Sequence, residues 1–195
     1  MSIELYHDDC FNIFPQLEDK SIDLVLCDMP YGTTACKWDT VIDLERMWVE
    51  LKRIVKDNAA IVLTASQPFT TTLICSNKDW FKYCWVWQKT CGAGFLNSKN
   101  APIKYHEDIL VFSRGNAANR CSNRMQYNPQ NLVKVNKIRK NNTNKDDSIG
   151  SRVSRLDGTI YVQQYSNYPT TILSFPNDAT KLHPTQKPIA LMEYL

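Results

Sequence analysis

The segment Asp28-Met29-Pro30-Tyr31 begins at the last residue of a short apolar run, SIDLVLCD (21–28). A carboxylate accepts hydrogen bonds from both hydrogens of an amino group, and a tyrosine ring offers a flat apolar face to a planar molecule. The proline stiffens the chain between these two groups. The combination suits a heterocyclic base that is held by its amino edge and by its ring face. The same residue types are common in plain turns, and taken alone the tetrapeptide favours a turn.

Strand and helix patterns alternate around this segment. Strands are predicted at 3–6, 21–28, 59–65, 83–88, 108–113 and 171–175, and helices at 11–17, 41–56, 68–76 and from Pro188 onward. The helix at 41–56 has apolar residues three and four positions apart and is predicted to end at Lys56-Asp57-Asn58. The run at 21–28 is typical of a strand buried on both faces. This alternation predicts an α/β fold with a mainly parallel sheet, at whose carboxyl edge ligands bind.

Length and composition place the chain among ordinary globular proteins. Its 195 residues are 43% hydrophobic and 22% charged, which is typical of one core. No apolar run approaches the ~20 residues of a membrane span, and the acidic start MSIELYHDD is unlike a signal peptide. Seven scattered cysteines without a C-x-x-C pair favour free thiols over a zinc site or disulfides. The sequence therefore predicts a cytoplasmic protein without membrane segment or metal.

Basic residues concentrate in one part of the chain. Residues 114–155 contain ten Lys or Arg and two acidic residues. Seven of these cations are Arg114, Arg120, Arg124, Lys134, Lys137, Arg139 and Lys140. The stretch is also rich in Asn and poor in apolar periodicity, which places it outside the core. Composition leaves two readings open, a solvated insertion and a surface that binds a polyanion.

Several motifs in the same order resemble one family, the amino-methyltransferases of DNA in the permuted arrangement called class β. The matching elements are Asp8-Asp9-Cys10, 21–28, Asp28-Met29-Pro30-Tyr31, Trp38-Asp39, Lys52-Arg53-Ile54, 85–89, 106–112 and HPTQKP (183–188). The family signature is Asp-Pro-Pro-Tyr, so Met29 departs from it at the second position. HPTQKP and the Asp-x-Pro-Tyr segment rarely occur together by chance.

The resemblance implies a Rossmann-like sheet that uses S-adenosylmethionine, and it implies a role for each motif. Asp28, Met29, Pro30 and Tyr31 would be catalytic: the Asp28 side chain and the Met29 carbonyl accept the amino hydrogens of a flipped base, and Tyr31 stacks on it. The residues implied to bind the cofactor are Asp9, Asp28, His183, Pro184, Thr185 and Lys187.

The resemblance also divides the chain into a catalytic core at 1–113, a basic target-recognition insertion at 114–170 and a return to the core at 171–195. The seven cations named above would bind double-stranded DNA, and a cognate restriction enzyme is a further partner known in such systems. In the family, a strand and a Phe-x-Gly-x-Gly turn follow HPTQKP and form the floor of the cofactor site. No such turn occurs here, which predicts a truncated, partial or split protein.

The activity implied for the complete protein is methylation of adenine N6 in duplex DNA. Without the floor of the cofactor site, the 195-residue chain is expected to bind S-adenosylmethionine negligibly and to be inactive by itself. Two alternatives stay open at this point. Cytosine-N4 methyltransferases share the fold, although their signature usually begins with Ser where this chain has Asp28. An inactive remnant could retain the basic insertion and still bind DNA. The sequence indicates neither the recognition site nor the oligomeric state.

Overall fold

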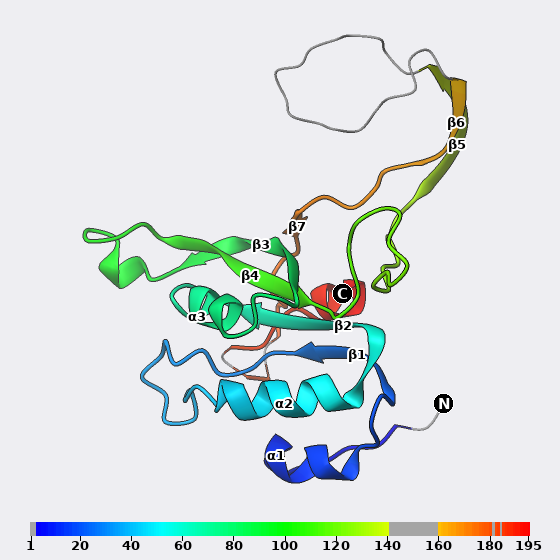
Figure 1. Cartoon of the computed structure of the whole chain (residues 1–195). Helices are drawn as coiled ribbons and strands as arrows, with labels where there is room; N and C mark the ends of the chain where they lie inside the picture. The colour runs from blue at the N-terminus through cyan, green and yellow to red at the C-terminus, as the bar shows by residue number, and fades with distance from the viewer. Residues whose placement is uncertain (1–2, 141–159, 181, 184) are drawn as a thin grey trace. The chain divides into compact units, whose positions relative to one another are not determined.

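The computed structural model describes residues 3–140, 160–180, 182–183 and 185–195. They fall into two compact units, one within residues 1–127 and 170–195 and the other within residues 128–169. Figure 1 shows the course of the chain and labels its elements.

The larger unit is built on a five-stranded sheet of order β1-β2-β4-β3-β7. Its strands are β1 (Ile22–Cys27), β2 (Val55–Ala65), β3 (Phe81–Ala93), β4 (Lys104–Phe112) and β7 (Ile172–Ser174). β1 runs parallel to β2 and β3 runs parallel to β7, whereas β4 is antiparallel to both its neighbours. Four of the five strands therefore point the same way, which confirms the predicted mainly parallel sheet.

Helices cover both faces of this sheet. They are α1 (Cys10–Ile13), α2 (Leu44–Ile54), α3 (Phe69–Ser76) and α4 (Ile189–Tyr194), with short 3-10 turns at Phe14–Gln16 and Phe95–Asn97. Asp43 begins α2 by accepting a hydrogen bond from the Arg46 amide at 3.0 Å. The predicted apolar stripe of α2 is buried and joins α3 and one face of β2 and β4 in the main core. Leu191 of α4 joins the opposite face of these two strands, through Val62 and Ile109.

Three predictions about elements were wrong. Residues 3–6 form no strand, and Ile3 and Leu5 are 83% and 92% exposed, because no described strand pairs with them. β1 is not buried on both faces, because it lies at the edge of the described sheet and Leu24 is 45% exposed. Residues 56–58 do not end α2 as a loop but continue β2, where Lys56 pairs with Asp23 of β1 at 2.6 Å.

The smaller unit contains an antiparallel ribbon of two strands, β5 (Val133–Lys140) and β6 (Ile160–Ser166). Part of the basic stretch is thus regular structure, which its composition did not indicate. Residues 141–155 of that stretch lie outside the described residues.

Candidate active site

The loop after β1 is held by a single carboxylate, that of Asp39. Its Oδ1 accepts the backbone N–H groups of Tyr31 and Gly32, both at 2.8 Å. Its Oδ2 accepts those of Thr33 and Thr34, at 2.9 and 2.7 Å. The Thr34 side chain, together with these backbone donors, lowers the pKa of Asp39 to about 2. Four consecutive amides are therefore oriented by one ionised side chain, which fixes the position of Tyr31.

Gly32 makes the turn within this loop possible. Its φ is +67°, in the left-handed region that residues with a Cβ rarely adopt. A Cβ at this position would also lie 2.8 Å from Cγ2 of Val41. Position 32 therefore requires glycine, both because of its backbone conformation and because the Val41 side chain leaves no room for a Cβ.

Replacement of Asp39 by asparagine is expected to loosen the loop. An amide has one acceptor oxygen, so two of the four bonds are lost and an NH₂ group is placed against backbone donors. The amides of residues 31–34 should then exchange hydrogen faster, as measured by mass spectrometry. The stabilising effect of the wild-type carboxylate is present above its unfolded pKa of about 3.9 and is lost as the pH falls through its folded pKa of about 2.

Asp43→Asn is the matched control for this experiment. It removes the same charge, but asparagine retains the capping of α2, because Asn and Asp are equally good N-cap residues. Unchanged exchange of residues 31–34 in Asp39→Asn would show that Asp39 does not hold the loop.

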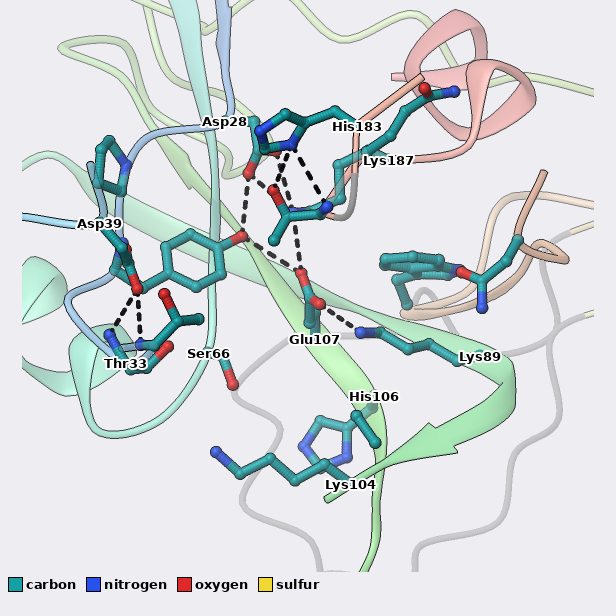
Figure 2. Close-up of a pocket in the computed structure, with 18 of the residues that line it drawn as sticks. Asp28, Thr33, Asp39, Ser66, Lys89, Lys104, His106, Glu107, His183 and Lys187 are labelled. Carbon is teal, nitrogen blue, oxygen red and sulfur yellow. Dashed lines mark hydrogen bonds and ion pairs between the residues drawn. The ribbon is translucent and has the colours of Figure 1, made fainter. Parts of the chain in front are cut away.

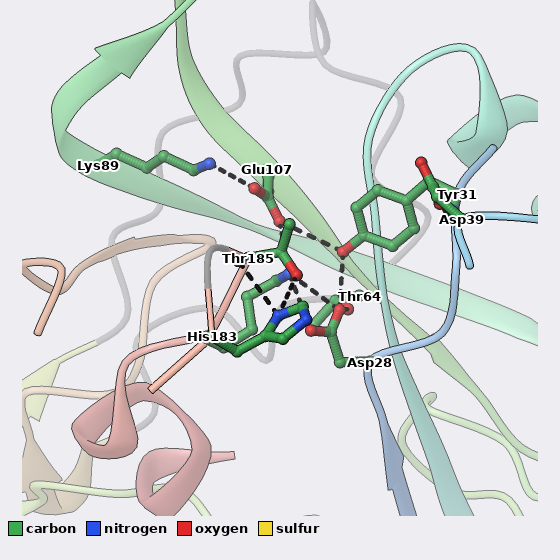
Figure 3. Close-up of polar contacts among 9 residues, drawn as sticks. Asp28, Tyr31, Asp39, Thr64, Lys89, Glu107, His183 and Thr185 are labelled. Atoms are coloured by element: carbon green, nitrogen blue, oxygen red, sulfur yellow. Dashed lines mark hydrogen bonds and ion pairs between the residues drawn. The ribbon is translucent and has the colours of Figure 1, made fainter. Parts of the chain in front are cut away.

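The Asp28 carboxylate stands directly after β1 and is surrounded by donors (Figure 3). Its Oδ1 accepts the Thr64 hydroxyl at 2.5 Å and the Tyr31 hydroxyl at 3.2 Å, and forms an ion pair with the Lys187 ammonium at 2.9 Å. Its Oδ2 accepts Lys187 at 3.0 Å. These partners come from a neighbouring strand, from the loop and from HPTQKP, so the structure joins the two strongest sequence motifs at one carboxylate.

A second carboxylate, Glu107 of β4, faces the same groups. It accepts the Tyr31 hydroxyl at 3.3 Å and pairs with Lys187 at 3.3 Å and with Lys89 of β3. The side chains of Glu107 and Lys187 are 14% and 7% exposed. Burial, followed by the charges of Glu107 and Asp28, raises the pKa of Tyr31, so its hydroxyl remains a donor. The cluster thus alternates two carboxylates with two ammonium groups around one tyrosine.

These groups line a pocket of about 660 Å³ (Figure 2). Its wall is formed by residues from the loop after β1, from β3 and β4, and from the segment 177–187. One face of the Tyr31 ring stacks on Phe69, with the ring centroids 5.7 Å apart. The pocket opens at the carboxyl edge of β1, the edge where ligands were predicted to bind.

The structure brings together most of the residues predicted for this site. Met29 is 6% exposed, and its side chain joins the main core. His183 and Thr185 line the pocket, and their side chains hydrogen-bond each other at 3.0 Å. Asp9 caps α1 through the Phe11 amide and does not line the pocket. Pro184 lies outside the described residues.

The predicted DNA-binding cations are all exposed, but they belong to different units. Arg114, Arg120 and Arg124 belong to the larger unit, where Arg114 pairs with Asp57 at 2.7 Å. The other four, Lys134, Lys137, Arg139 and Lys140, lie on β5.

Four residues of the site had no predicted role: Asp39, Thr64, Lys89 and Glu107. Asp39, Lys89 and Glu107 lie within motifs that matched the family, although no role was predicted for them. Thr64 meets Asp28 across 36 positions of sequence and Glu107 meets Tyr31 across 76. Only the strand order of the sheet places these pairs together.

Comparison with known proteins identifies the family. The model described as DNA methylase, N6_N4_Mtase, matches residues 22–195. The chain therefore belongs to the N6/N4 DNA methylase family, whose members use S-adenosylmethionine.

The individual relatives have low sequence identity to this chain. The Type II methyltransferase M1.MboII of Moraxella bovis is 26% identical over 123 residues, which cover 57% of this chain and 46% of the relative. The chain thus spans about half the length of that relative. The solved PvuII DNA methyltransferase, which is cytosine-N4-specific, matches with a TM-score of 0.55 and 13% identity over 97% of this chain and 67% of its own. This likeness shows the fold, that of an S-adenosylmethionine-dependent methyltransferase.

Three residues that the resemblance implied for cofactor binding, Asp28, Thr185 and Lys187, line the pocket. Their carboxylate, hydroxyl and ammonium are polar and charged groups of the kind that a charged cofactor needs. Asp9, which was expected to hold the adenosine part, lies outside the pocket.

Among the described residues, no group of three or more His, Cys, Asp or Glu could hold a metal ion, and no helix is long and apolar enough to cross a membrane. All seven cysteines are free thiols.

Proposed function

We propose that the protein is a site-specific DNA methyltransferase that transfers a methyl group from S-adenosylmethionine to N6 of a flipped adenine in duplex DNA. The observation that carries this proposal is the Asp28 carboxylate, which stands at a sheet edge inside a pocket with Tyr31 and Lys187.

Asp28 retains a place for an amino hydrogen. Each carboxylate oxygen accepts about two hydrogen bonds. Oδ1 already receives two donors, the hydroxyls of Thr64 and Tyr31, whereas Oδ2 receives only Lys187. The open site on Oδ2 would accept one amino hydrogen of the base, and the Met29 carbonyl would accept the other.

The pocket also suits a base that has left the duplex. A duplex buries the adenine amino group, so the base must be flipped out at a cost of a few kcal/mol. The volume of about 660 Å³ lies in the range of small-molecule sites. Phe69 covers one face of Tyr31, so the base would stack on the other face.

The main catalytic contribution of this chain is then to orient the amino group of the base relative to the methyl donor. Two accepted hydrogen bonds draw the lone pair of the amino nitrogen out of conjugation with the ring and direct it toward the methyl donor. The cofactor supplies an electrophilic methyl group when it is bound. Lys187 holds Asp28 in place from the side and balances its charge, while Tyr31 and Thr64 orient its Oδ1.

The ring of Tyr31 is expected to matter more than its hydroxyl. Tyr31→Ala removes the stacking surface and should lower kcat/KM by about 10- to 100-fold, because stacking on a base contributes about 1–3 kcal/mol. Tyr31→Phe retains the ring and removes two long hydrogen bonds of 3.2 and 3.3 Å. We expect it to cost less than about tenfold, since the hydroxyl has a single hydrogen to share between these two acceptors and a hydrogen bond contributes about 1 kcal/mol. Equal losses in the two variants would assign the role to the hydroxyl.

Double-stranded DNA is the proposed partner of six of the seven exposed cations, all except Lys140. Lys and Arg neutralise phosphates and release counterions, which supplies much of the affinity for DNA. Cytosine N4 is the second candidate target, because the PvuII enzyme of the same fold acts there. Asp28, in a position where that branch usually has Ser, favours adenine.

The base can be identified in cells that express the chain and lack other methyltransferases. Their DNA is digested and its nucleosides are analysed by mass spectrometry. N6-methyladenine is expected. N4-methylcytosine would support the second candidate, and neither product, with the protein folded and bound to DNA, would indicate the inactive remnant.

A further inference from the structure

We propose that the β5–β6 ribbon contacts DNA with only one of its two faces, and that Arg139 on this face reads a base. The proposal rests on the function proposed above. It concerns the smaller unit alone. It assigns different roles to the cations of β5, which the sequence analysis predicted as one group of DNA-binding residues.

The pairing register assigns each side chain to a face. Residues opposite each other on paired strands point to the same side of a sheet, and successive residues alternate. The pairs on one side are Lys134 with Tyr165, Lys137 with Gln163, and Arg139 with Tyr161. A register irregularity between Lys134 and Lys137 keeps both lysines on this side. We call this side the polar face.

The other side is called the aliphatic face. Its pairs are Val133 with Ser166, Ile138 with Val162, and Lys140 with Ile160. Ile138, Val162 and Ile160 are 75%, 56% and 69% exposed. Lys140 is the one cation of β5 on this face. It carries the same charge as Lys134, Lys137 and Arg139, but its neighbours on the ribbon are aliphatic.

The polar face has the composition of a surface that binds nucleic acid. It combines three cations, two tyrosines and an amide, and neither strand contains an acidic residue. A two-stranded ribbon fits the major groove of B-DNA, which is about 12 Å wide. Aliphatic side chains offer nothing to phosphates, so the opposite face is unsuited to this contact.

Arg139 differs from the lysines of the polar face because its head group is oriented. Its Nε donates to Oε1 of Gln163 at 3.0 Å, and Nε2 of Gln163 donates to the Tyr165 carbonyl at 3.0 Å. This chain of bonds fixes the plane of the guanidinium from the opposite strand. A planar guanidinium with a defined direction suits O6 and N7 of guanine, whereas a flexible ammonium suits a phosphate.

Selection from a random duplex library, followed by titration at several salt concentrations, tests this division without knowledge of the recognition site. The full chain is used, and circular dichroism verifies the fold of each variant. Wild type should enrich one motif. Arg139→Lys should retain the affinity for random DNA and lose discrimination at one G·C pair by about 5- to 150-fold.

Lys137→Ala and Lys140→Ala form the matched pair, because they remove the same charge from opposite faces. Lys137→Ala should weaken binding to all sequences and reduce the slope of log K against log salt by about 0.9. Lys140→Ala should change neither affinity nor slope. Equal losses in the two lysine variants would overturn the division into faces, and an unchanged motif in Arg139→Lys would overturn its reading role. A wild-type chain that binds no DNA would instead refute the proposed function itself.

Discussion

Replacement of Asp28 by alanine is expected to reduce methyl transfer by about 100- to 1000-fold or more, the loss typical when a group that stabilises a transition state is removed. The variant loses the acceptor on Oδ2 and the partner that Lys187, Thr64 and Tyr31 share. DNA affinity should stay near that of wild type, because phosphate contacts supply most of it. Turnover of labelled cofactor and fluorescence anisotropy with labelled duplex measure the two quantities.

Asp23→Ala is the control for this variant. Asp23 lies on β1, the strand that Asp28 follows, but it is exposed and pairs with Lys56 at the surface. Its removal should leave turnover unchanged. Wild-type turnover in Asp28→Ala would refute the assignment of Asp28, whereas a parallel loss of DNA binding would indicate a damaged fold.

Replacement of Lys187 by methionine is expected to lower the free energy of unfolding by about 3 kcal/mol, because it leaves partly buried carboxylates without their shared cation. Lys187 lies 2.9 Å from Asp28 and 3.3 Å from Glu107, and its side chain is 7% exposed. Methyl transfer should fall as well, since Asp28 loses the group that holds it from the side. Urea unfolding followed by circular dichroism measures the change in stability.

A double-mutant cycle separates charge from packing in this cluster. Addition of Glu107→Gln to Lys187→Met removes one of the two carboxylates and should restore part of the lost stability. Lys56→Met is the matched surface control and should cost less than about 1 kcal/mol, because its pair with Asp23 is exposed to solvent. If the two methionine variants had equal effects, the buried cluster would have no special energetic role.

The fold was predictable where local patterns were strong. The apolar spacing of α2 and the compact strands β1 and β2 indicated their elements directly. The strand expected at 3–6 was wrong because a short apolar run becomes a strand only beside another strand, and none of the described strands pairs with it. The ribbon was missed although Val133-Lys134-Val135 and Ile138 alternate with polar residues, because high Asn and Lys content resembled an unstructured insertion.

Those residues of the site that lie in the two strongest sequence motifs could be predicted. Asp28 and Tyr31 were indicated by the Asp-x-Pro-Tyr segment and Lys187 by HPTQKP, in both cases through the resemblance to the family. Their meeting point was not predictable from spacing, because Lys187 and Asp28 are 159 positions apart. Glu107 and Lys89 entered the cluster only through the antiparallel pairing of β3 with β4, which places their side chains together.

The most direct measurement is transfer of a trideuterated methyl group from S-adenosylmethionine to duplex DNA, by purified protein in a form that includes the Phe-x-Gly-x-Gly turn, read by mass spectrometry of the nucleosides. We predict that the label appears on the exocyclic nitrogen of adenine, within one recurring sequence, and that it is absent with Asp28→Ala. Label on a ring carbon, or equal labelling by wild type and Asp28→Ala, would contradict a pocket in which Asp28 holds the amino group of a flipped base.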